Sequence, residues 1–442
     1  MAQLFGTDGI RGVANTELTP ELAVGLGRAL VRTLREEGIA RPLVAVGRDP
    51  RPSGEMLEAA LVAGVASAGG DLIPLGVLPT PGVAYLTTHL GADSGVMISA
   101  SHNPVEDNGI KCFGADGFKL TDAEEERVEE LMQRTDQDRP VGLHIGRLRP
   151  RPDALGAYVD HLASSCAADL DGLRVVVDCA NGAAATVAPQ ALRRLGCDVV
   201  AINTRLDGDR INDGCGSTHP EVVAAAVREH KAELGFAHDG DADRLIAADA
   251  DGRVVDGDQI LAVLAARLHA EGRLDTVVTT VMTNLGFKQA MAGRGIGVVE
   301  TKVGDRYVLE AMRAGGHILG GEQSGHVILA EHATTGDGVL TAVQLLCALR
   351  AGDATLAEQA AIMRRLPQVL VNVRGVDRDR LDAAAELWEA VKREEAELGD
   401  AGRVLVRASG TEPMVRVMVE ADTEERAGAV AGRLADVVRR TL

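Results

Sequence analysis

Short apolar runs alternate with amphipathic segments along most of the chain. This alternation is typical of α/β folds, in which strands and helices follow one another and pack in layers. In the first third of the chain it predicts buried strands at 43–47, 71–77 and 95–100, and helices at 53–68 and 81–90.

Two further helices are indicated by the residues that precede them. Thr19 can cap a helix whose first position is Pro20, and proline is favoured there because that position needs no N–H donor. Thr121 and Glu124 have the spacing of a capping box. These residues predict helices that begin at 20 and at 122.

The pattern also divides the chain. Apolar periodicity lapses between residues 133 and 153, where charged residues and prolines dominate, and it changes again near 366. A chain of 442 residues exceeds one ordinary domain. We predict an α/β protein with three similar mixed-sheet domains and a smaller α+β C-terminal domain, at residues 1–150, 151–253, 254–365 and 366–442.

Acidic residues outnumber basic ones by 65 to 46, which gives a formal net charge of −19. Proteins that bind nucleic acid without sequence preference use a basic surface, so we expect no nucleic-acid partner. An anionic substrate would need a locally basic pocket. No apolar stretch approaches the ~18 residues of a membrane span, and the N-terminus lacks a signal pattern. We therefore expect no membrane partner and a cytoplasmic location.

Aromatic residues supply only 2% of the chain, so few rings are available to stack on a ligand. We expect any ligand to be recognised by hydrogen bonds and charge. The six cysteines are scattered and include no C-x-x-C pair, which predicts buried reduced thiols and neither a disulfide framework nor a zinc site. They are Cys112, Cys166, Cys179, Cys197, Cys215 and Cys347.

A polar loop follows an apolar run in each predicted α/β domain, the C-terminal domain has one more, and all but the first of these loops contain glycine. In open parallel sheets, ligands bind beyond the carboxyl ends of the strands. We therefore expect these loops to converge on one cleft. They are 99–104 (SASHNP), 238–244 (HDGDADR), 320–326 (GGEQSGH) and 407–413 (RASGTEP).

Asp239, Asp241 and Asp243 stand at alternate positions, with Gly240 between the first two. Such a run can turn several carboxylates onto one hard cation, and Mg²⁺ accepts a few carboxylates while keeping positions for phosphate. The Gly and Glu that an EF-hand loop requires at its sixth and twelfth positions are absent. The alternative is a solvated acidic turn. Arg244 fits a phosphate or sugar contact, or an ion pair with these acids.

Ser101 follows a predicted strand and precedes His102. A serine beside a histidine suggests a nucleophile and its base, but neighbouring side chains along a strand point apart, and G-x-S-x-G is absent. A serine that carries phosphate fits better, because its charge would meet the predicted Mg²⁺. The alternative is an ordinary turn serine.

The loop from Arg407 to Arg416 contains two arginines, two hydroxyl side chains and a glycine that allows close approach of backbone N–H groups. This combination suits a phosphate dianion, and the alternative is a hairpin turn with solvated arginines. The candidate phosphate ligands here are Arg407, Ser409, Gly410, Thr411 and Arg416.

Two smaller groups of polar residues remain. Glu322 and His326 flank Ser324, and each can contact sugar hydroxyls or only the turn backbone. Lys111 and Lys302 lie at predicted strand ends, where they can serve as phosphate or acid–base groups or be plain surface charges.

Taken in order, the four loops resemble the α-D-phosphohexomutase superfamily over essentially the whole chain. The resemblance implies four domains around a central cleft and a phosphorylated Ser101. It implies Mg²⁺ bound by Asp239, Asp241 and Asp243 together with the serine phosphate. It also assigns sugar hydroxyl contacts to Glu322 and Ser324, and the distal phosphate to the 407–416 loop.

Within the superfamily, the chain resembles the branch that acts on glucosamine phosphate. The resemblance rests on FGTDGIRG at 5–12, which contains Arg11, on KVGDRYV at 302–308, and on Ala242 and Gln323. Ala408 stands where the family usually has Pro, and Cys112 where an aromatic residue is common. Neither departure removes a functional group.

The resemblance implies an isomerase that interconverts glucosamine 6-phosphate and glucosamine 1-phosphate through a 1,6-bisphosphate, in amino-sugar nucleotide (UDP-GlcNAc, cell-wall precursor) biosynthesis. The general base is left open between His102, Lys111 and His326, and so is the donor that first phosphorylates Ser101. The alternatives are a phosphomannomutase/phosphoglucomutase and a non-catalytic sugar-phosphate-binding protein. Substrate contacts are expected from Arg11, Arg244, Lys302, Glu322, Ser324, Arg407, Ser409, Gly410, Thr411 and Arg416.

Overall fold

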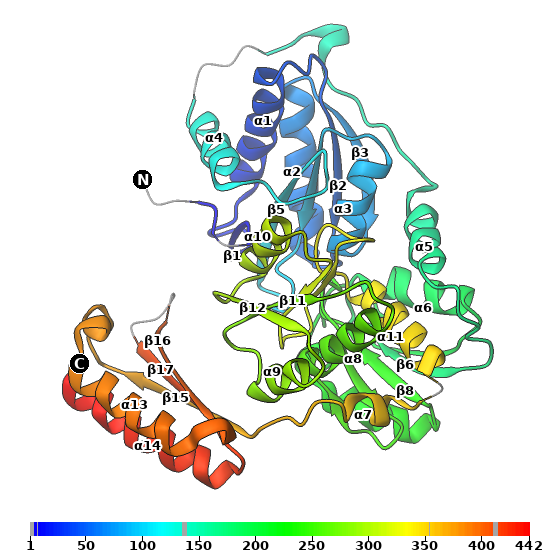
Figure 1. Ribbon diagram of the computed structural model, residues 1–442. Helices are drawn as coiled ribbons and strands as arrows, with labels where there is room; N and C mark the ends of the chain where they lie inside the picture. The colour runs from blue at the N-terminus through cyan, green and yellow to red at the C-terminus, as the bar shows by residue number, and fades with distance from the viewer. Residues whose placement is uncertain (1–3, 7, 135–138, 353, 410–413) are drawn as a thin grey trace. The chain divides into compact units, whose positions relative to one another are not determined.

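The computed structural model describes residues 4–6, 8–134, 139–352, 354–409 and 414–442 (Figure 1). The chain forms two compact units. The larger comprises Met1–Val281 and Ile296–Ala360, and the smaller comprises Met282–Gly295 and Ala361–Leu442. The segment Met282–Gly295 therefore packs with the C-terminal region and not with the strands that flank it in sequence.

The first sheet of the larger unit has the strand order β1-β5-β4-β2-β3. Here β2 (Leu43–Arg48) runs parallel to β3 (Asp71–Val77) and to β4 (Ser94–Ile98). In contrast, β5 (Asp107–Gly114) is antiparallel to β4, and β1 (Ile10–Val13) is antiparallel to β5. The three parallel strands were predicted from the sequence, whereas β1 and β5 were not.

The helices of this sheet begin where the capping residues predict. The Thr19 hydroxyl accepts a hydrogen bond from the Leu22 backbone N–H, and Thr121 and Glu124 form a complete capping box. Apolar side chains of α1, α2 and α4 form one core with the buried faces of the strands. The helices are α1 (Pro20–Glu36), α2 (Pro52–Ser67), α3 (Thr80–His89) and α4 (Asp122–Met132).

The second sheet has the order β10-β9-β8-β6-β7. Its parallel strands β6, β7 and β8 are followed by the antiparallel pair β9 and β10. The strands are β6 (Arg174–Asp178), β7 (Asp198–Ile202), β8 (Leu234–Ala237), β9 (Ile246–Asp249) and β10 (Val254–Val255). The helices are α5 (Ala154–Ser164), α6 (Ala184–Arg194) and α7 (Pro220–His230).

The third sheet has the order β12-β11-β13-β14, with β14 antiparallel to β13 and the other pairs parallel. Its strands are β11 (Thr276–Thr280), β12 (Gly297–Thr301), β13 (Leu319–Gly321) and β14 (Val327–Leu329). Its helices are α8 (Gly257–Ala270), α10 (Asp305–Gly315), α11 (Gly338–Gly352) and α12 (Leu356–Ala360).

One arrangement recurs in these three sheets. In each, the last parallel strand turns directly into an antiparallel strand at its side: β4 into β5, β8 into β9, and β13 into β14. The three polar loops at 99–104, 238–244 and 322–326 are the turns of these hairpins. The predicted similarity of the three α/β domains is confirmed, and it extends to the position of each loop.

The smaller unit contains an antiparallel sheet of order β15-β17-β16. Helices α13 and α14 pack on it through a Val-, Leu- and Ala-rich core. Helix α9 also belongs to this unit, and the Leu285 N–H donates to the Glu420 carboxylate at 2.7 Å. The elements are α9 (Leu285–Ala292), β15 (Gln368–Arg374), α13 (Ala385–Leu398), β16 (Arg403–Ala408), β17 (Met414–Glu420) and α14 (Glu424–Thr441).

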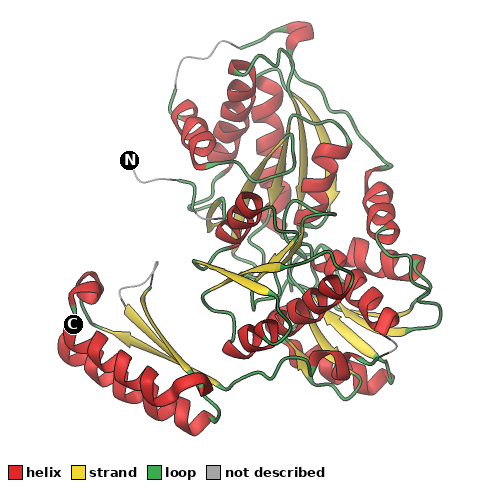
Figure 2. Cartoon of the chain, in the orientation of Figure 1, coloured by secondary structure: helices red, strands yellow, loops and turns green. Residues whose placement is uncertain are grey.

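The described residues thus form four sheets, each accompanied by helices (Figure 2). The predicted fold class, three mixed-sheet α/β domains and a smaller α+β domain, is confirmed. The predicted boundaries near 150, 253 and 365 stay predictions. Among the described residues, no helix combines the length and the hydropathy needed to cross a bilayer.

The prediction that all six cysteines are reduced is wrong for two of them. Cys166, which follows α5, and Cys347, in α11, form a disulfide with their Cα atoms 6.1 Å apart. They are 181 residues apart in sequence, so only the packing of α11 against α5 brings them together. Cys112, Cys179, Cys197 and Cys215 are free and buried, as predicted.

Candidate functional site

Ser101 lies in the turn between β4 and β5, and its side chain is almost fully buried. Its backbone φ is 53°, a left-handed conformation that is uncommon for a residue with a Cβ. The Ser101 N–H donates to the Ser99 hydroxyl at 2.9 Å, and that hydroxyl donates to Asp49 at 2.6 Å. The strained turn is thus held by its neighbours, which is characteristic of functional loops.

Arg51 holds the same turn through hydrogen bonds to its backbone carbonyl oxygens. Its guanidinium is fully buried and paired with Asp49 at 2.9 Å. It donates to the carbonyl oxygens of Ser101 at 3.0 Å and Asn103 at 2.8 Å, and also to those of Pro104 and Asp107. The planar guanidinium has several N–H donors in fixed positions, so it can bond several backbone carbonyls of the strained turn at once.

Sequence reasoning missed Arg51. The available signal was the run Gly-Arg-Asp-Pro-Arg at 47–51, which places polar residues directly after a predicted buried strand. A second contact comes from the segment between β7 and α7, where the Asn212 amide donates to the Ser101 carbonyl oxygen at 2.9 Å.

Asp239, Asp241 and Asp243 occupy the turn between β8 and β9, and all three are buried. One carboxylate oxygen from each lies within 4.8 Å of the others. Gly240 allows this turn to approach the serine turn, because a Cβ at that position would lie 2.5 Å from the Ser101 carbonyl oxygen. The sequence prediction that the three acids gather at one point is supported by this placement.

The charges of these acids are only partly balanced by the protein. Burial, together with repulsion from the other two carboxylates, raises the pKa of Asp239 well above its ordinary value. Burial and the nearby Asp241 also raise the pKa of Asp243. For Asp241 burial is outweighed by Lys111 and by the Thr80 hydroxyl at 2.5 Å, so its pKa is lowered. Repulsion among buried carboxylates favours a bound cation.

The triad fits Mg²⁺ by a second criterion. The Oδ1 atoms of Asp239, Asp241 and Asp243 are buried and have no hydrogen-bond partner among the described residues. Buried acceptors without donors are costly, and a hard cation would satisfy all three. Ser101 Oγ donates to Asp239 Oδ2 at 2.5 Å, so a phosphate on this serine would adjoin the same three carboxylates.

Lys111 lies within β5 and is fully buried, so it is not the surface charge at a strand end that the sequence allowed as an alternative. Its Nζ is 3.0 Å from Asp241, 3.3 Å from Asp8 and 3.6 Å from Asp243. Burial alone would lower the pKa of Lys111, but these carboxylates outweigh it and raise the pKa. These partners favour the protonated form of Lys111.

The side chains of Ser101 and His102 do not point apart as a strand would require. Ser101 Oγ and His102 Nδ1 are 3.4 Å apart, because the left-handed serine bends the chain. Burial, with the nearby cations Arg244 and Arg11, lowers the pKa of His102 to about 4. His102 is therefore neutral near pH 7 and can accept a proton.

The third loop is fastened to the metal loop. Gly325 has φ of +91°, and a Cβ there would lie 2.1 Å from the Leu245 carbonyl oxygen. The Leu245 N–H donates to the Gly325 carbonyl at 3.0 Å. This contact places His326 beside Arg244, with which it forms a backbone β-bridge.

A cavity of about 440 Å³ opens between the three loops. Its lining contains two arginines, two histidines and four acids from five separate segments, so it offers both cations for a phosphate and acceptors for sugar hydroxyls. Of the predicted residues it is lined by Arg11, His102, Asp243, Arg244, Glu322 and His326.

Other predicted substrate contacts do not line this cavity. Ser324 donates its hydroxyl to Glu322 at 3.3 Å and is not part of the lining. Lys302 is exposed on the surface. Lys111, Asp239 and Asp241 are buried and do not line this cavity either.

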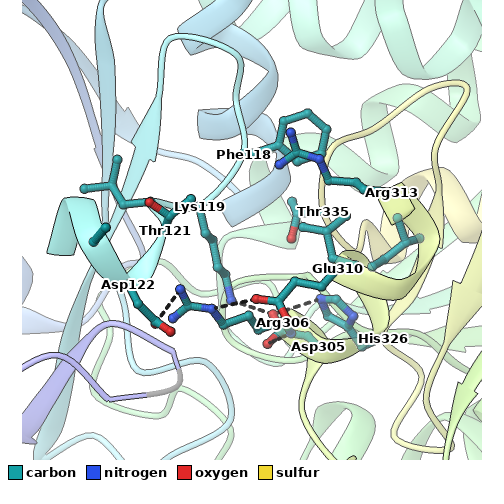
Figure 3. A pocket seen from close by; sticks show the side chains of 14 residues that line it. Phe118, Lys119, Thr121, Asp122, Asp305, Arg306, Glu310, Arg313, His326 and Thr335 are labelled. Carbon is teal, nitrogen blue, oxygen red and sulfur yellow. Dashed lines mark hydrogen bonds and ion pairs between the residues drawn. The ribbon is translucent and has the colours of Figure 1, made fainter. Parts of the chain in front are cut away.

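A network of charges that sequence reasoning missed joins one side of this cavity to a neighbouring cavity of about 300 Å³ (Figure 3). Lys119 pairs with Asp8 and, at 2.5 Å, with Asp305, whose other neighbour is His326 Nε2 at 3.7 Å. Arg306 reaches Asp122 at 2.6 Å. These pairs tie the start of α10 to the N-terminal segment and to α4. The signal lay in the 5–12 and 302–308 motifs, which contain Asp8 and Asp305.

In the smaller unit, Arg407 and Arg416 are direct partners across β16 and β17. Burial and the neighbouring Arg416 lower the pKa of Arg407. Two guanidinium groups held side by side favour an anion between them. Ser409 ends this strand region, while Gly410 and Thr411 lie outside the described residues.

Sequence models of four domains of one family match successive parts of the chain. They describe the phosphoglucomutase/phosphomannomutase α/β/α domain I at residues 2–139, domain II at 156–252, domain III at 256–366, and the C-terminal domain at 370–437. The phosphoglucosamine mutase of Thermobifida fusca is 58% identical, and the alignment covers 100% of this chain and 99% of that protein.

Solved structures of proteins with related names have the same fold. A phosphoglucomutase/phosphomannomutase family protein from Burkholderia thailandensis has a TM-score of 0.82 and 26% identity, with 100% of this chain and 97% of that chain covered. The N-acetylphosphoglucosamine mutase of Aspergillus fumigatus, solved with GlcNAc-6P and magnesium, shares the fold with a TM-score of 0.70 at 20% identity, with 99% and 96% covered. The chain therefore belongs to the phosphoglucomutase/phosphomannomutase family, within the α-D-phosphohexomutase superfamily.

Proposed function

We propose that this chain is a phosphoglucosamine mutase, an isomerase that interconverts glucosamine 6-phosphate and glucosamine 1-phosphate. The observation that carries the proposal is the hydrogen bond, 2.5 Å long, between Ser101 Oγ and a buried carboxylate triad beside a cavity that two arginines line. The 58% identity to a phosphoglucosamine mutase over the whole chain supports the choice of sugar.

In the proposed cycle, phospho-Ser101 transfers its phosphoryl group to O1 of glucosamine 6-phosphate. The P–Oγ bond breaks, a P–O1 bond forms, and a base takes the O1 proton. The resulting 1,6-bisphosphate turns end for end and its 6-phosphoryl group returns to Ser101. The P–O6 bond breaks, the P–Oγ bond forms again, the proton taken by the base is given to O6, and glucosamine 1-phosphate leaves. Positioning and charge neutralisation supply most of the acceleration in phosphoryl transfer.

Asp239, Asp241 and Asp243 would hold Mg²⁺ together with the serine phosphate. When bound, Mg²⁺ neutralises charge on the transferring group. Arg11 and Arg244 contact phosphate or sugar in the cavity. His102, Lys111 and His326 are the proposed candidates for the base. Arg407, Ser409, Gly410, Thr411 and Arg416 are proposed to hold the phosphate that is not reacting.

The choice of sugar is tested by comparing substrates. Glucosamine carries an amine at C2, and Glu322 lines the cavity with a carboxylate that can accept a charge-assisted hydrogen bond from it. We expect kcat/KM for glucosamine 6-phosphate to exceed that for glucose 6-phosphate by at least about tenfold, or roughly 1.4 kcal/mol. A coupled assay with both substrates and mannose 6-phosphate measures this ratio.

Equal or faster turnover of the mannose or glucose ester would promote the phosphomannomutase/phosphoglucomutase alternative. Absence of turnover with all three would favour a sugar-phosphate-binding protein without catalysis. Gln323 is not expected to set the preference, because it does not line the cavity. We further propose that the product enters amino-sugar nucleotide biosynthesis in the cytoplasm.

Arg51→Lys should reduce kcat about ten- to a hundredfold while leaving KM nearly unchanged. Lysine keeps the charge near Asp49 but cannot reach the carbonyls of Ser101 and Asn103 together, so the serine turn would shift and misalign the phosphoryl group. Steady-state kinetics and a thermal melt of the folded variant measure this. Arg28→Lys is the matched control, since Arg28 bonds Ser67 far from the turn. An unchanged kcat in a variant that folds would remove Arg51 from this role.

A further inference from the structure

A second cavity, of about 410 Å³, lies apart from the catalytic cavity and is almost as large. It is an open pocket lined by residues of α3 and α5, by Asp116 and by the segment 330–337 between β14 and α11. The two cavities share no lining residue. The proposed reaction gives this second cavity no task.

Its lining differs from the rest of the chain. The protein has three tyrosines, and two of them, Tyr85 and Tyr158, are here, together with His89, His161 and His332. The Tyr85 ring is stacked with His161 at 4.1 Å and with His89 at 5.3 Å between centroids. Aromatic side chains contribute large contact areas and favour stacked or edge contacts with other rings.

Charge further restricts what this cavity can bind. Among the described residues that line it, none is Lys or Arg, whereas Asp116, Glu331 and Asp337 are acidic. The catalytic cavity, in contrast, is lined by Arg11 and Arg244. A sugar phosphate is therefore disfavoured here, and an aromatic molecule without negative charge is favoured.

The walls are fixed before any ligand arrives. His161 Nε2 is 2.9 Å from the His332 carbonyl oxygen, so α5 is tied to the 330–337 segment. The Thr334 hydroxyl donates to the Gly117 carbonyl at 2.6 Å, and the Tyr158 hydroxyl donates to Asp337 at 2.6 Å. Pre-formed pockets lose less free energy to ordering when they bind.

Two helix starts next to residues that line the cavity, Thr80 beside Pro81 and Gly338 beside Asp337, are bonded directly to the metal loop. At the start of α3, Thr80 donates its hydroxyl to Asp241 at 2.5 Å and its N–H to the Asp241 carbonyl at 3.0 Å. At the start of α11, the N–H of Gly338 donates to the carbonyl of Ala242 at 3.0 Å. A ligand that shifts either helix start would change the placement of the metal-binding carboxylates.

We propose that this cavity, bounded by Tyr85, Tyr158, His161 and the 330–337 segment, is a regulatory site for a planar aromatic molecule that carries no negative charge. Its occupancy is coupled to the metal loop through Thr80 and Gly338. Because such coupling is reciprocal, the ligand changes the affinity for Mg²⁺ by the same factor as Mg²⁺ changes the affinity for the ligand.

The test uses the full-length enzyme and three probes with one ring system: indole, tryptamine and indole-3-acetate. Saturation-transfer NMR and calorimetry should show binding of indole and tryptamine, and binding of indole-3-acetate at least about tenfold weaker. Glucosamine 6-phosphate should not displace the bound probe. Tyr85→Leu should weaken indole binding at least about tenfold, whereas Tyr85→Phe, which keeps the ring, should not.

His161→Gln offers a second variant if Tyr85→Leu does not fold. Displacement of indole by the sugar phosphate, equal binding by Tyr85→Leu or His161→Gln, or no binding of any probe would overturn the site. The coupling is tested by calorimetric Mg²⁺ titration with and without saturating indole, where we expect at least about a threefold change in Kd. Equal Mg²⁺ affinities would overturn the coupling.

Discussion

Ser101→Ala is expected to lower mutase turnover at least about 10³-fold, because the variant has no oxygen to carry the phosphoryl group. The protein should fold normally, since the change removes one polar loop atom and opens no core cavity. A coupled assay with glucosamine 6-phosphate measures the turnover of both proteins. Intact mass and phosphopeptide mapping should place phosphate on Ser101 in wild-type protein and none in the variant.

Ser67→Ala is a suitable control, because Ser67 bonds Gly64 and Arg28 away from the serine turn. It should keep wild-type turnover. Full activity of Ser101→Ala would contradict the phosphoserine mechanism. So would phosphate found only on another residue in fully active protein.

Asp241→Asn should lower turnover at limiting Mg²⁺ by about 10² to 10³-fold, which corresponds to roughly 3–4 kcal/mol. The change removes one of three negative charges from the cation site and the nearest carboxylate from the buried Lys111, 3.0 Å away. Calorimetric Mg²⁺ titration and turnover at several Mg²⁺ concentrations separate weaker metal binding from slower chemistry.

Asp251→Asn is the matched control, because that carboxylate is exposed and pairs with Arg253 on the surface. It should leave both measurements unchanged. If Asp241→Asn retains the wild-type Mg²⁺ affinity and turnover, the metal lies elsewhere and the triad has a different role.

Local signals in the sequence were sufficient for much of the fold. The buried parallel strands and the capped helix starts at Thr19 and Thr121 depend on residues within a few positions of each other, so their patterns are visible in the chain. The aspartate triad is equally local, since its three carboxylates belong to one turn.

The features that were missed depend on contacts between distant segments. Lys111 is buried because Asp8 and Asp241, far away in sequence, surround its charge. Arg51 reaches carbonyls about fifty residues ahead, and Cys347 meets Cys166 only after α11 packs on α5. A hydrophobic pattern cannot report such pairs, because it records each residue without its partners.

Local geometry also overturned one argument made from sequence. The expectation that Ser101 and His102 point apart assumed strand geometry, whereas a single left-handed residue at 101 brings their side chains within 3.4 Å. Polar loops are the places where such departures concentrate, because strain there serves positioning.

Because the three polar loops are hairpin turns, the substrate contacts of one loop can be redesigned separately from the strands. Because residues 322–326 form the turn between β13 and β14, this segment can be exchanged for that of a relative with another sugar preference while the apolar strands stay as they are. The constraint is Gly325, whose contact with the Leu245 carbonyl leaves no room for a side chain. A graft that keeps this glycine can alter the sugar contacts while retaining the phosphoserine turn and the metal loop.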